Sequence, residues 1–158
     1  MKYRHLLGVP FVHGSSDCYE IIRRFYQDNF SIKLRPYARA DGWWDAGLNL
    51  YMDNFEAEGF RTVDIQPHQA QPADIFLTAI PSGVANHAGI YLGNGEILHH
   101  YIGRLSEVVK VKGVWRNNLC AIIRHKDVVI PVEEITVDIL DHILPHKRAA
   151  YLDAQQPQ

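Results

Sequence analysis

Residues 86–101 read NHAGIYLGNGEILHHY, and this stretch decides the fold class. Two apolar runs flank Asn94-Gly95, a dipeptide that strongly favours a two-residue β-hairpin loop. The pattern therefore predicts two antiparallel strands joined by a tight turn. Other short apolar runs predict further strands at residues 61–65, 71–80, 106–113 and 119–125.

A helical pattern begins well before the hairpin, at Asp17. Asp17 is a good N-cap, and Glu20 three residues later forms a capping-box pair with it. Apolar residues then recur at helical spacing as far as Asn29, which gives the helix one apolar face. The residues of that face are Ile21, Ile22, Phe25 and Tyr26.

A second helical pattern covers residues 43–58, after a loop at residues 31–42. Gly59 is its predicted C-cap, although Gly47 weakens the pattern from within. The predicted buried side consists of Trp43, Trp44, Leu48, Tyr51, Met52 and Phe55. Helices followed by short strands predict an α+β fold, with N-terminal helices packed on an antiparallel sheet.

Length and composition indicate an ordinary globular protein. The chain has 158 residues, of which 47% are hydrophobic and 22% charged, with a net charge of −2. No basic stripe indicates nucleic-acid binding. No apolar run approaches the roughly 20 residues of a membrane span. The N-terminal segment does not have the pattern of a signal peptide, so we expect synthesis in a cytoplasm.

The two cysteines lie in different settings, Cys18 at a helix start and Cys120 in an apolar run. Cys18 follows the N-cap directly, where unpaired N–H groups and the helix dipole favour a thiolate and lower the thiol pKa. The Asp17 carboxylate opposes this effect unless it turns back into the cap. We expect Cys120 to be a small core residue, and a reducing compartment argues against a disulfide.

The hairpin brings a base close to a second histidine. His87 opens the first strand, and the adjacent His99 and His100 close the second. A strict two-residue loop pairs Ile90 with His99 and puts His100 on the face of His87. One extra loop residue pairs Tyr91 with His99 and puts His99 on that face. The residues alone leave both registers open.

A metal site is the other use of a cysteine and histidine cluster. The chain contains no CxxC, HxxxH or HExxH pattern. His99 and His100 are neighbours on a strand, so their side chains point to opposite faces. We therefore predict neither a metal site nor a cofactor.

Two stretches together resemble the NlpC-type cell-wall cysteine peptidases. They are PFVHGSSDCYEIIRRFY at residues 10–26 and NHAGIYLGNGEILHH at residues 86–100. The likeness covers residues 3–126 and is greatest to the phage tail members of this family. It implies a papain-like fold, with residues 1–126 as the peptidase domain and residues 127–158 as a C-terminal extension. The extension is predicted to be partly helical, at residues 133–144 before Pro145, and disordered at its end.

The resemblance also implies roles for particular residues. Cys18 corresponds to the nucleophile, His87 to the base and His99 to the polar residue that orients the base, which favours the second register. His100 is the fallback for the third role.

The chain departs from the family pattern upstream of the cysteine. The family has a tyrosine that assists at the oxyanion, and Phe11 stands at that place without a donor. This leaves the Cys18 backbone N–H as a donor, with His13 and Phe11 as candidate oxyanion or substrate-pocket residues.

The implied function is hydrolysis of amide bonds in peptidoglycan stem peptides, at the bond from γ-D-glutamate to a diamino acid. Its implied partners are the wall peptide and other phage tail-tip proteins. Its implied location is the host cytoplasm on synthesis, then the virion tail or a tail-assembly intermediate that acts on the wall. One alternative is a structural tail-tip component with weak or no activity. Another is a thiol acyltransferase or amidase with a substrate outside the wall.

Overall fold

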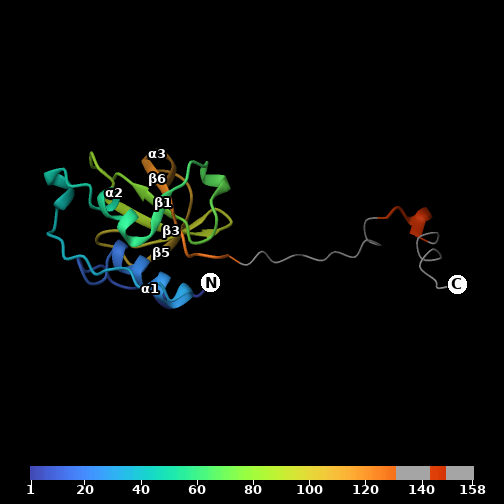
Figure 1. Ribbon diagram of the computed structural model, residues 1–158, viewed down its shortest axis with the longest axis horizontal. Coiled ribbons are helices and arrows are strands. Elements are labelled where there is room, and N and C mark those ends of the chain that lie inside the picture. Colours follow the sequence, from blue (N-terminus) through green and yellow to red (C-terminus); the bar gives the residue numbers. More distant parts are fainter. Residues whose placement is uncertain (131–142, 149–158) are drawn as a thin grey trace.

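The computed structural model describes residues 1–130 and 143–148 and contains one six-stranded antiparallel sheet (Figure 1). The strand order is β1-β6-β2-β3-β4-β5. The strands are β1 (Phe60–Thr62), β2 (Ile75–Thr78), β3 (His87–Gly93), β4 (Glu96–His99), β5 (Glu107–Lys110) and β6 (Leu119–His125). The α+β class and the antiparallel sheet predicted from the sequence are confirmed.

Helix α1 (Cys18–Phe30) packs on one face of the sheet, against β3. Asp17 is its N-cap, as predicted, and Ser31 ends it in a left-handed conformation with φ 57°. The four predicted apolar residues of this helix are all buried. The position of α1 brings its N-terminus, and with it Cys18, to the strands that carry the histidines.

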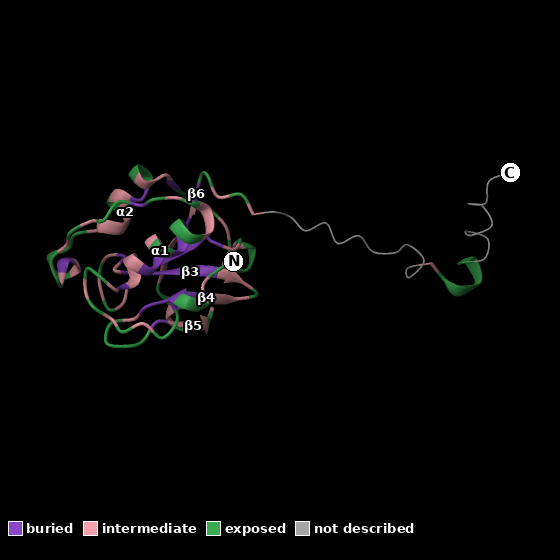
Figure 2. Ribbon diagram, turned by 90° about the horizontal axis from the view of Figure 1, so that it is seen from below, coloured by how far each residue is buried: buried purple, intermediate pink, exposed green. Residues whose placement is uncertain are grey.

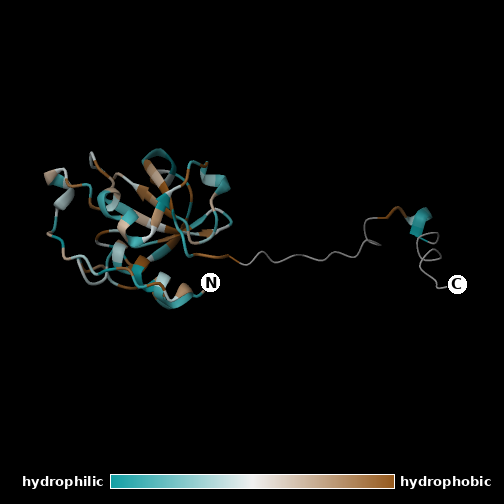
Figure 3. Ribbon diagram, viewed as in Figure 1, coloured by the Kyte–Doolittle hydropathy of each residue, from teal (hydrophilic) through white to brown (hydrophobic). Residues whose placement is uncertain are grey.

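The core lies on both faces of the sheet. On the α1 face, the helix packs over Leu77, Ala88 and Leu98. On the opposite face, Phe76 and Tyr91 form a smaller cluster with Trp115 from the short helix α3 (Val114–Asn117). Buried residues are concentrated in the central strands (Figure 2), where hydrophobic residues also predominate (Figure 3).

The predicted helix over residues 43–58 is wrong as a single element. The segment consists of a 3-10 turn η2 (Trp43–Ala46), a short helix α2 (Leu50–Asn54) and a 3-10 turn η3 (Glu56–Glu58). Gly47 has φ 74° and breaks the helix, because this conformation is incompatible with a continuing right-handed turn. Leu48 is consequently 50% exposed, although it was predicted to be buried. Gly59 ends η3 with φ 89°, as a C-cap does.

The prediction that Cys120 is a core residue is also wrong. Cys120 is exposed. Strand β6 pairs Ala121 with Leu77 and Leu119 with Thr78, so the register shifts at this point. Cys120 is the extra residue of that irregularity and is directed away from the core. Both cysteines are free thiols.

The remaining connecting elements are η1 (Arg4–Leu6) and η4 (Pro67–Gln69). No helix within the described residues is both long and apolar enough to cross a membrane. The helix predicted at residues 133–144 lies, apart from its last two residues, outside the described residues. Residues 145–148 form a helical turn that begins at Pro145.

Candidate functional site

The start of α1 is organised by the Asp17 carboxylate. One oxygen accepts hydrogen bonds from the backbone N–H groups of Tyr19 and Glu20, both at 3.0 Å. The other accepts from the Gly14 N–H at 2.7 Å and from the guanidinium of Arg39. The carboxylate is therefore turned back into the cap and is paired with a cation.

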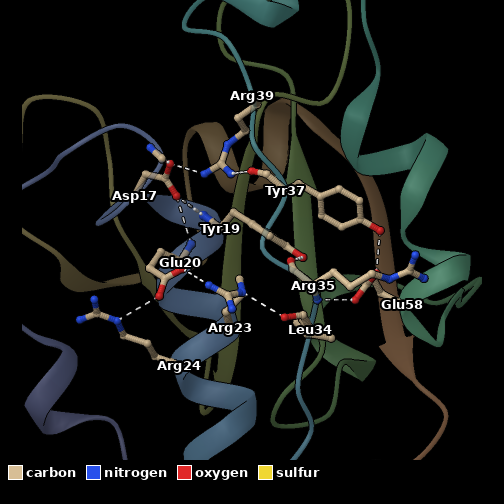
Figure 4. Close-up of polar contacts among 11 residues, drawn as sticks. Asp17, Tyr19, Glu20, Arg23, Arg24, Leu34, Arg35, Tyr37, Arg39 and Glu58 are labelled. Carbon is tan, nitrogen blue, oxygen red and sulfur yellow. Dashed lines mark hydrogen bonds and ion pairs between the residues drawn. The ribbon is translucent and has the colours of Figure 1, made fainter.

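Glu20 does not complete the capping box that the sequence predicted. Its carboxylate instead binds Arg23 at 2.5 Å and Arg24 at 3.3 Å (Figure 4). Arg39 also donates to the Tyr37 carbonyl at 2.9 Å. Helix α1 and the loop before η2 are thus linked by charged side chains beside the cysteine.

The Cys18 thiol lies 3.2 Å from the hydroxyl of Tyr51, which comes from α2. Burial raises the pKa of this thiol, and the Asp17 carboxylate raises it further. The hydrogen bond from Tyr51 and the charge of Arg39 lower the pKa, but they do not outweigh burial. The expectation that the helix start lowers the thiol pKa is therefore wrong for this structure.

The hairpin places His99, and not His100, beside His87. The Nδ1 atom of His99 lies 3.2 Å from the Nε2 atom of His87. His99 pairs with Gly89 across the two strands, which neither predicted register contained. The turn closes with Gly93 opposite Glu96, and a bulge at Leu92 then shifts the register. The extra residue thus lies in β3 and not in the loop, and it brings His99 to the face of His87.

The two paired histidines are buried under an aromatic cover. His87 is 7% exposed and His99 6%. The Trp115 ring lies 5.1 Å from the His87 ring and 5.2 Å from the His99 ring, and Tyr101 packs on His87 at 5.2 Å. Burial lowers the pKa of His87 to about 3 and that of His99 to about 4. Both imidazoles are therefore neutral near neutral pH.

His99 also pairs with Glu107 across β4 and β5. Its Nε2 atom lies 3.9 Å from the Glu107 carboxylate, beyond hydrogen-bond distance. That carboxylate raises the pKa of His99 and partly opposes the effect of burial. A neutral His99 with its proton on Nε2 presents Nδ1 as an acceptor to His87.

A cleft of about 80 Å³ brings the cysteine and His87 together. Within residues 1–130 the structure shows no hydrogen bond between their side chains. Phe11, His13 and His100, which the sequence singled out, line the same cleft. The other lining residues are Asp17, Arg39, Trp43, Trp44, Tyr51, Ile80, Asn86, Tyr101 and Ile102.

These three residues have distinct environments. His100 lies on the opposite face of the hairpin from His99 and packs edge-on against Phe11 at 5.3 Å. Its Nε2 is buried without a hydrogen-bond partner. His13 Nε2 lies 3.2 Å from the Arg39 carbonyl, so this ring is held at the edge of the cleft. His100 therefore does not take the place beside His87 that the fallback required.

Tyr51 is the site residue that sequence reasoning missed. The helical pattern identified it only as a residue of a buried face. No local signal relates residue 51 to residue 18, because the contact depends on how α2 packs beside α1. Tyr51 also borders a second, mostly apolar cavity of about 230 Å³ behind the cleft, between α1, α2 and the sheet.

No group of three or more potential metal ligands occurs among residues 1–130 and 143–148. The site in these residues is a thiol, a neutral imidazole pair and hydrogen-bond donors. This set of groups is suited to acyl transfer through a sulfur nucleophile.

A cysteine at the start of a helix, packed against an antiparallel sheet that supplies histidines to its cleft, defines a papain-like domain. Residues 8–124 match the NlpC/P60 family, and the chain belongs to this family.

Two curated relatives are phage proteins with the same name. Tail tip assembly protein K of Escherichia phage lambda is 40% identical over 122 residues, which cover 77% of this chain and 60% of that protein. Tail tip assembly protein K of Escherichia phage N15 is 35% identical over 128 residues, covering 78% and 50%. The chain thus spans 50% to 60% of the length of these relatives.

Solved structures show the same fold. The crystal structure of the NlpC/p60 domain of peptidoglycan hydrolase SagA matches with a TM-score of 0.52 and 19% identity. The match covers 76% of this chain and 90% of that domain. At this identity the likeness establishes the fold and leaves the activity to be argued from the site.

Proposed function

We propose that the chain is a phage tail-associated cysteine hydrolase that cleaves amide bonds in peptidoglycan stem peptides. The observation that carries the proposal is the shared cleft of Cys18 and His87, with His99 on the far nitrogen of His87. A nucleophile, a base and a group that orients the base are the three elements of such a site. Membership of the NlpC/P60 family supports the same reading.

The contact between the histidines sets the role of each nitrogen. His87 Nε2 is engaged by His99, so Nδ1 is the nitrogen available to the thiol. His87 takes the thiol proton as Sγ bonds to the scissile carbonyl carbon, and the carbonyl π pair moves to oxygen. As the pair returns, the carbon–nitrogen bond breaks and the leaving amine takes the proton from His87. Water, deprotonated by His87, then releases the acyl group and restores the thiol.

The resting site is a neutral thiol beside a neutral imidazole. This follows because the pKa of Cys18 is raised and that of His87 is lowered to about 3. His87 therefore acts as a general base during attack, and a preformed thiolate–imidazolium pair is not required. The thiol–imidazole hydrogen bond is expected to form when substrate enters, since catalytic contacts commonly tighten in the complex.

For the substrate, we propose the bond between γ-D-glutamate and a diamino acid, as the family resemblance implies. The names of the two curated relatives support a place in the phage tail tip, beside other tail proteins, and hence action on the wall during infection. We assign hydrolysis to residues 1–126, with residues 127–158 as an extension.

The test uses purified chain and the defined tripeptide L-alanyl-γ-D-glutamyl-meso-diaminopimelate. The parent should release free diaminopimelate, and Cys18→Ala and His87→Ala should release none. Cys120→Ser is the matched control, because it removes the exposed thiol outside the cleft. Release at the parent rate by Cys18→Ala would refute the proposal.

A second candidate function is structural, in tail-tip assembly. The specific observation that favours it is that the Cys18 thiol has a raised pKa and is hydrogen-bonded to Tyr51 and not to a base. A phage that carries Cys18→Ala in its copy of this chain separates the two functions. If this phage assembles complete tails but does not cleave the wall, the chain is an enzyme whose activity is not needed for assembly. Normal infectivity of this phage would favour the structural role.

A further inference from the structure

We propose that the Tyr51 hydroxyl is a catalytic hydrogen-bond donor to the oxyanion in this hydrolase. The inference rests on the proposed function and adds a residue to it that lies 33 positions from the nucleophile in sequence.

The ring of Tyr51 is held in place from two sides. Its centroid lies 6.1 Å from that of Trp43 and 6.3 Å from that of Tyr19, in both cases with edge-to-face geometry. The hydroxyl is thereby directed at Cys18 Sγ at 3.2 Å. A ring fixed in this way needs only a rotation of its O–H group when charge develops nearby, and a small reorganisation of this kind favours oxyanion stabilisation.

The Tyr51 hydroxyl can make a stronger hydrogen bond to an oxyanion during the reaction than it makes to the resting thiol. A thiol sulfur is a weak acceptor, so the hydroxyl gains little from it before attack. When Sγ bonds to the carbonyl carbon, the π pair moves to an oxygen only two bonds from the sulfur. The Tyr51 O–H can then turn from sulfur to that oxygen and donate to it, and its own proton is not transferred.

The state of the phenol fits a donor. Burial raises the pKa of Tyr51 well above its ordinary value, and neighbouring Cys18 and Asp17 raise it further, against the Arg39 charge. The phenol is therefore protonated near neutral pH and can act as a donor. The N–H groups of Tyr19 and Glu20 are bound by Asp17, so the Cys18 backbone N–H is the other candidate donor at the start of α1, and Tyr51 would complete a pair with it.

Other cleft residues are less suited to the task. Phe11 has no donor and packs on His100. His13 is engaged with the Arg39 carbonyl at 3.2 Å. Tyr101 also lines the cleft, but its ring packs against His87. Tyr51 is the one of these residues whose polar atom contacts the reacting sulfur.

The experiment compares kcat and KM on the same tripeptide in a Cys120→Ser background. Tyr51→Phe should lower kcat by about 10²- to 10³-fold, the usual loss for one oxyanion donor, with KM little changed. Tyr26→Phe is the matched control, because it removes a buried hydroxyl that donates to the Ala73 carbonyl at 2.6 Å, away from the thiol. It should leave kcat near that of the parent.

A second readout separates catalysis from structure. The midpoint of Cys18 alkylation by iodoacetamide should move to higher pH in Tyr51→Phe, because the lost hydrogen bond had lowered the thiol pKa. An unchanged kcat in an active parent background overturns this inference alone, and an inactive parent overturns it together with the proposed function. A fall in kcat with a raised KM, a lowered Tm and an unmoved midpoint would indicate a structural role and would also overturn it.

Discussion

Gly89 on β3 lies directly opposite His99 on β4, and the space beside its missing side chain is filled by Trp115. A Cβ at Gly89 would lie 2.5 Å from both Ile97 Cγ2 and the Trp115 ring. The absence of one methyl group thus lets the indole cover both histidine rings.

Gly89→Ala should therefore destabilise the protein and disturb the histidine pair. Overpacking of a core of this kind costs about 1–3 kcal/mol. Urea unfolding measures the loss, and tryptophan fluorescence reports on displacement of Trp115. Gly83→Ala is the control, because nothing lies within 4 Å of a Cβ there. Equal stability of the two variants would contradict the packing described here.

Acid should destabilise the fold through the two buried imidazoles. Their folded-state pKa values are lowered to about 3 and 4, from an ordinary 6.5. Below pH 6.5 these histidines are protonated in the unfolded chain and neutral in the folded chain. The free energy of unfolding therefore falls with falling pH until the folded-state pKa is reached. Each histidine contributes up to about 1.4 kcal/mol per pH unit in this window.

Measurement of unfolding free energy from pH 7 down to pH 4.5 tests this coupling. His99→Gln should show a shallower slope than the parent, whatever its absolute stability. His68→Gln, at an exposed position, should retain the parent slope. A parent slope in His99→Gln would mean that His99 is not buried as a neutral base.

The thiol of Cys18 should titrate above an ordinary cysteine. Burial and the Asp17 charge raise its pKa, whereas Arg39 lowers it. In a Cys120→Ser background, the midpoint of iodoacetamide alkylation should fall in Asp17→Asn and rise in Arg39→Met. A midpoint below that of a free thiol in the parent would show that the helix start outweighs burial after all.

Removal of one partner of the ion pair between Asp74 and Arg124 should strongly destabilise the protein. Two hydrogen bonds of 2.7 and 2.8 Å join the pair, and Asp74 is 1% exposed. Arg124→Met leaves a buried carboxylate without its partner, which costs about 3–5 kcal/mol. Lys110→Met breaks a surface pair with Glu96 and should cost at most about 1 kcal/mol. Similar Tm losses for both variants would contradict the difference in burial.

Local signals predicted the elements whose causes are local. Asp17 caps a helix through its own side chain, and Asn94-Gly95 closes a hairpin through its own backbone, so both were recognisable in the sequence. The break at Gly47 was visible only as a weak position, because a glycine within a helical pattern does not by itself decide the conformation. The α+β class followed from the order of these elements.

The details of the site depended on distant contacts. The bulge at Leu92 changes which residue His99 faces, and no motif predicts where a strand gains its extra residue. The same limitation explains Cys120, which lies outside the pairing at an irregularity of β6. The contact of Tyr51 with Cys18 and the burial that raises the thiol pKa both arise from tertiary packing.

The bulge at Leu92 also determines which length changes this hairpin can accept in related sequences. Loss of the bulged residue Leu92 would keep Gly89 opposite His99. Leu92 has no partner on β4, so the pairs from Tyr91 back to Gly89 would not change. Loss of one residue between His87 and Tyr91 would instead bring His100 to the face of His87. Alignment gaps a few positions apart in β3 therefore have opposite meanings, and only the first kind preserves the histidine pair.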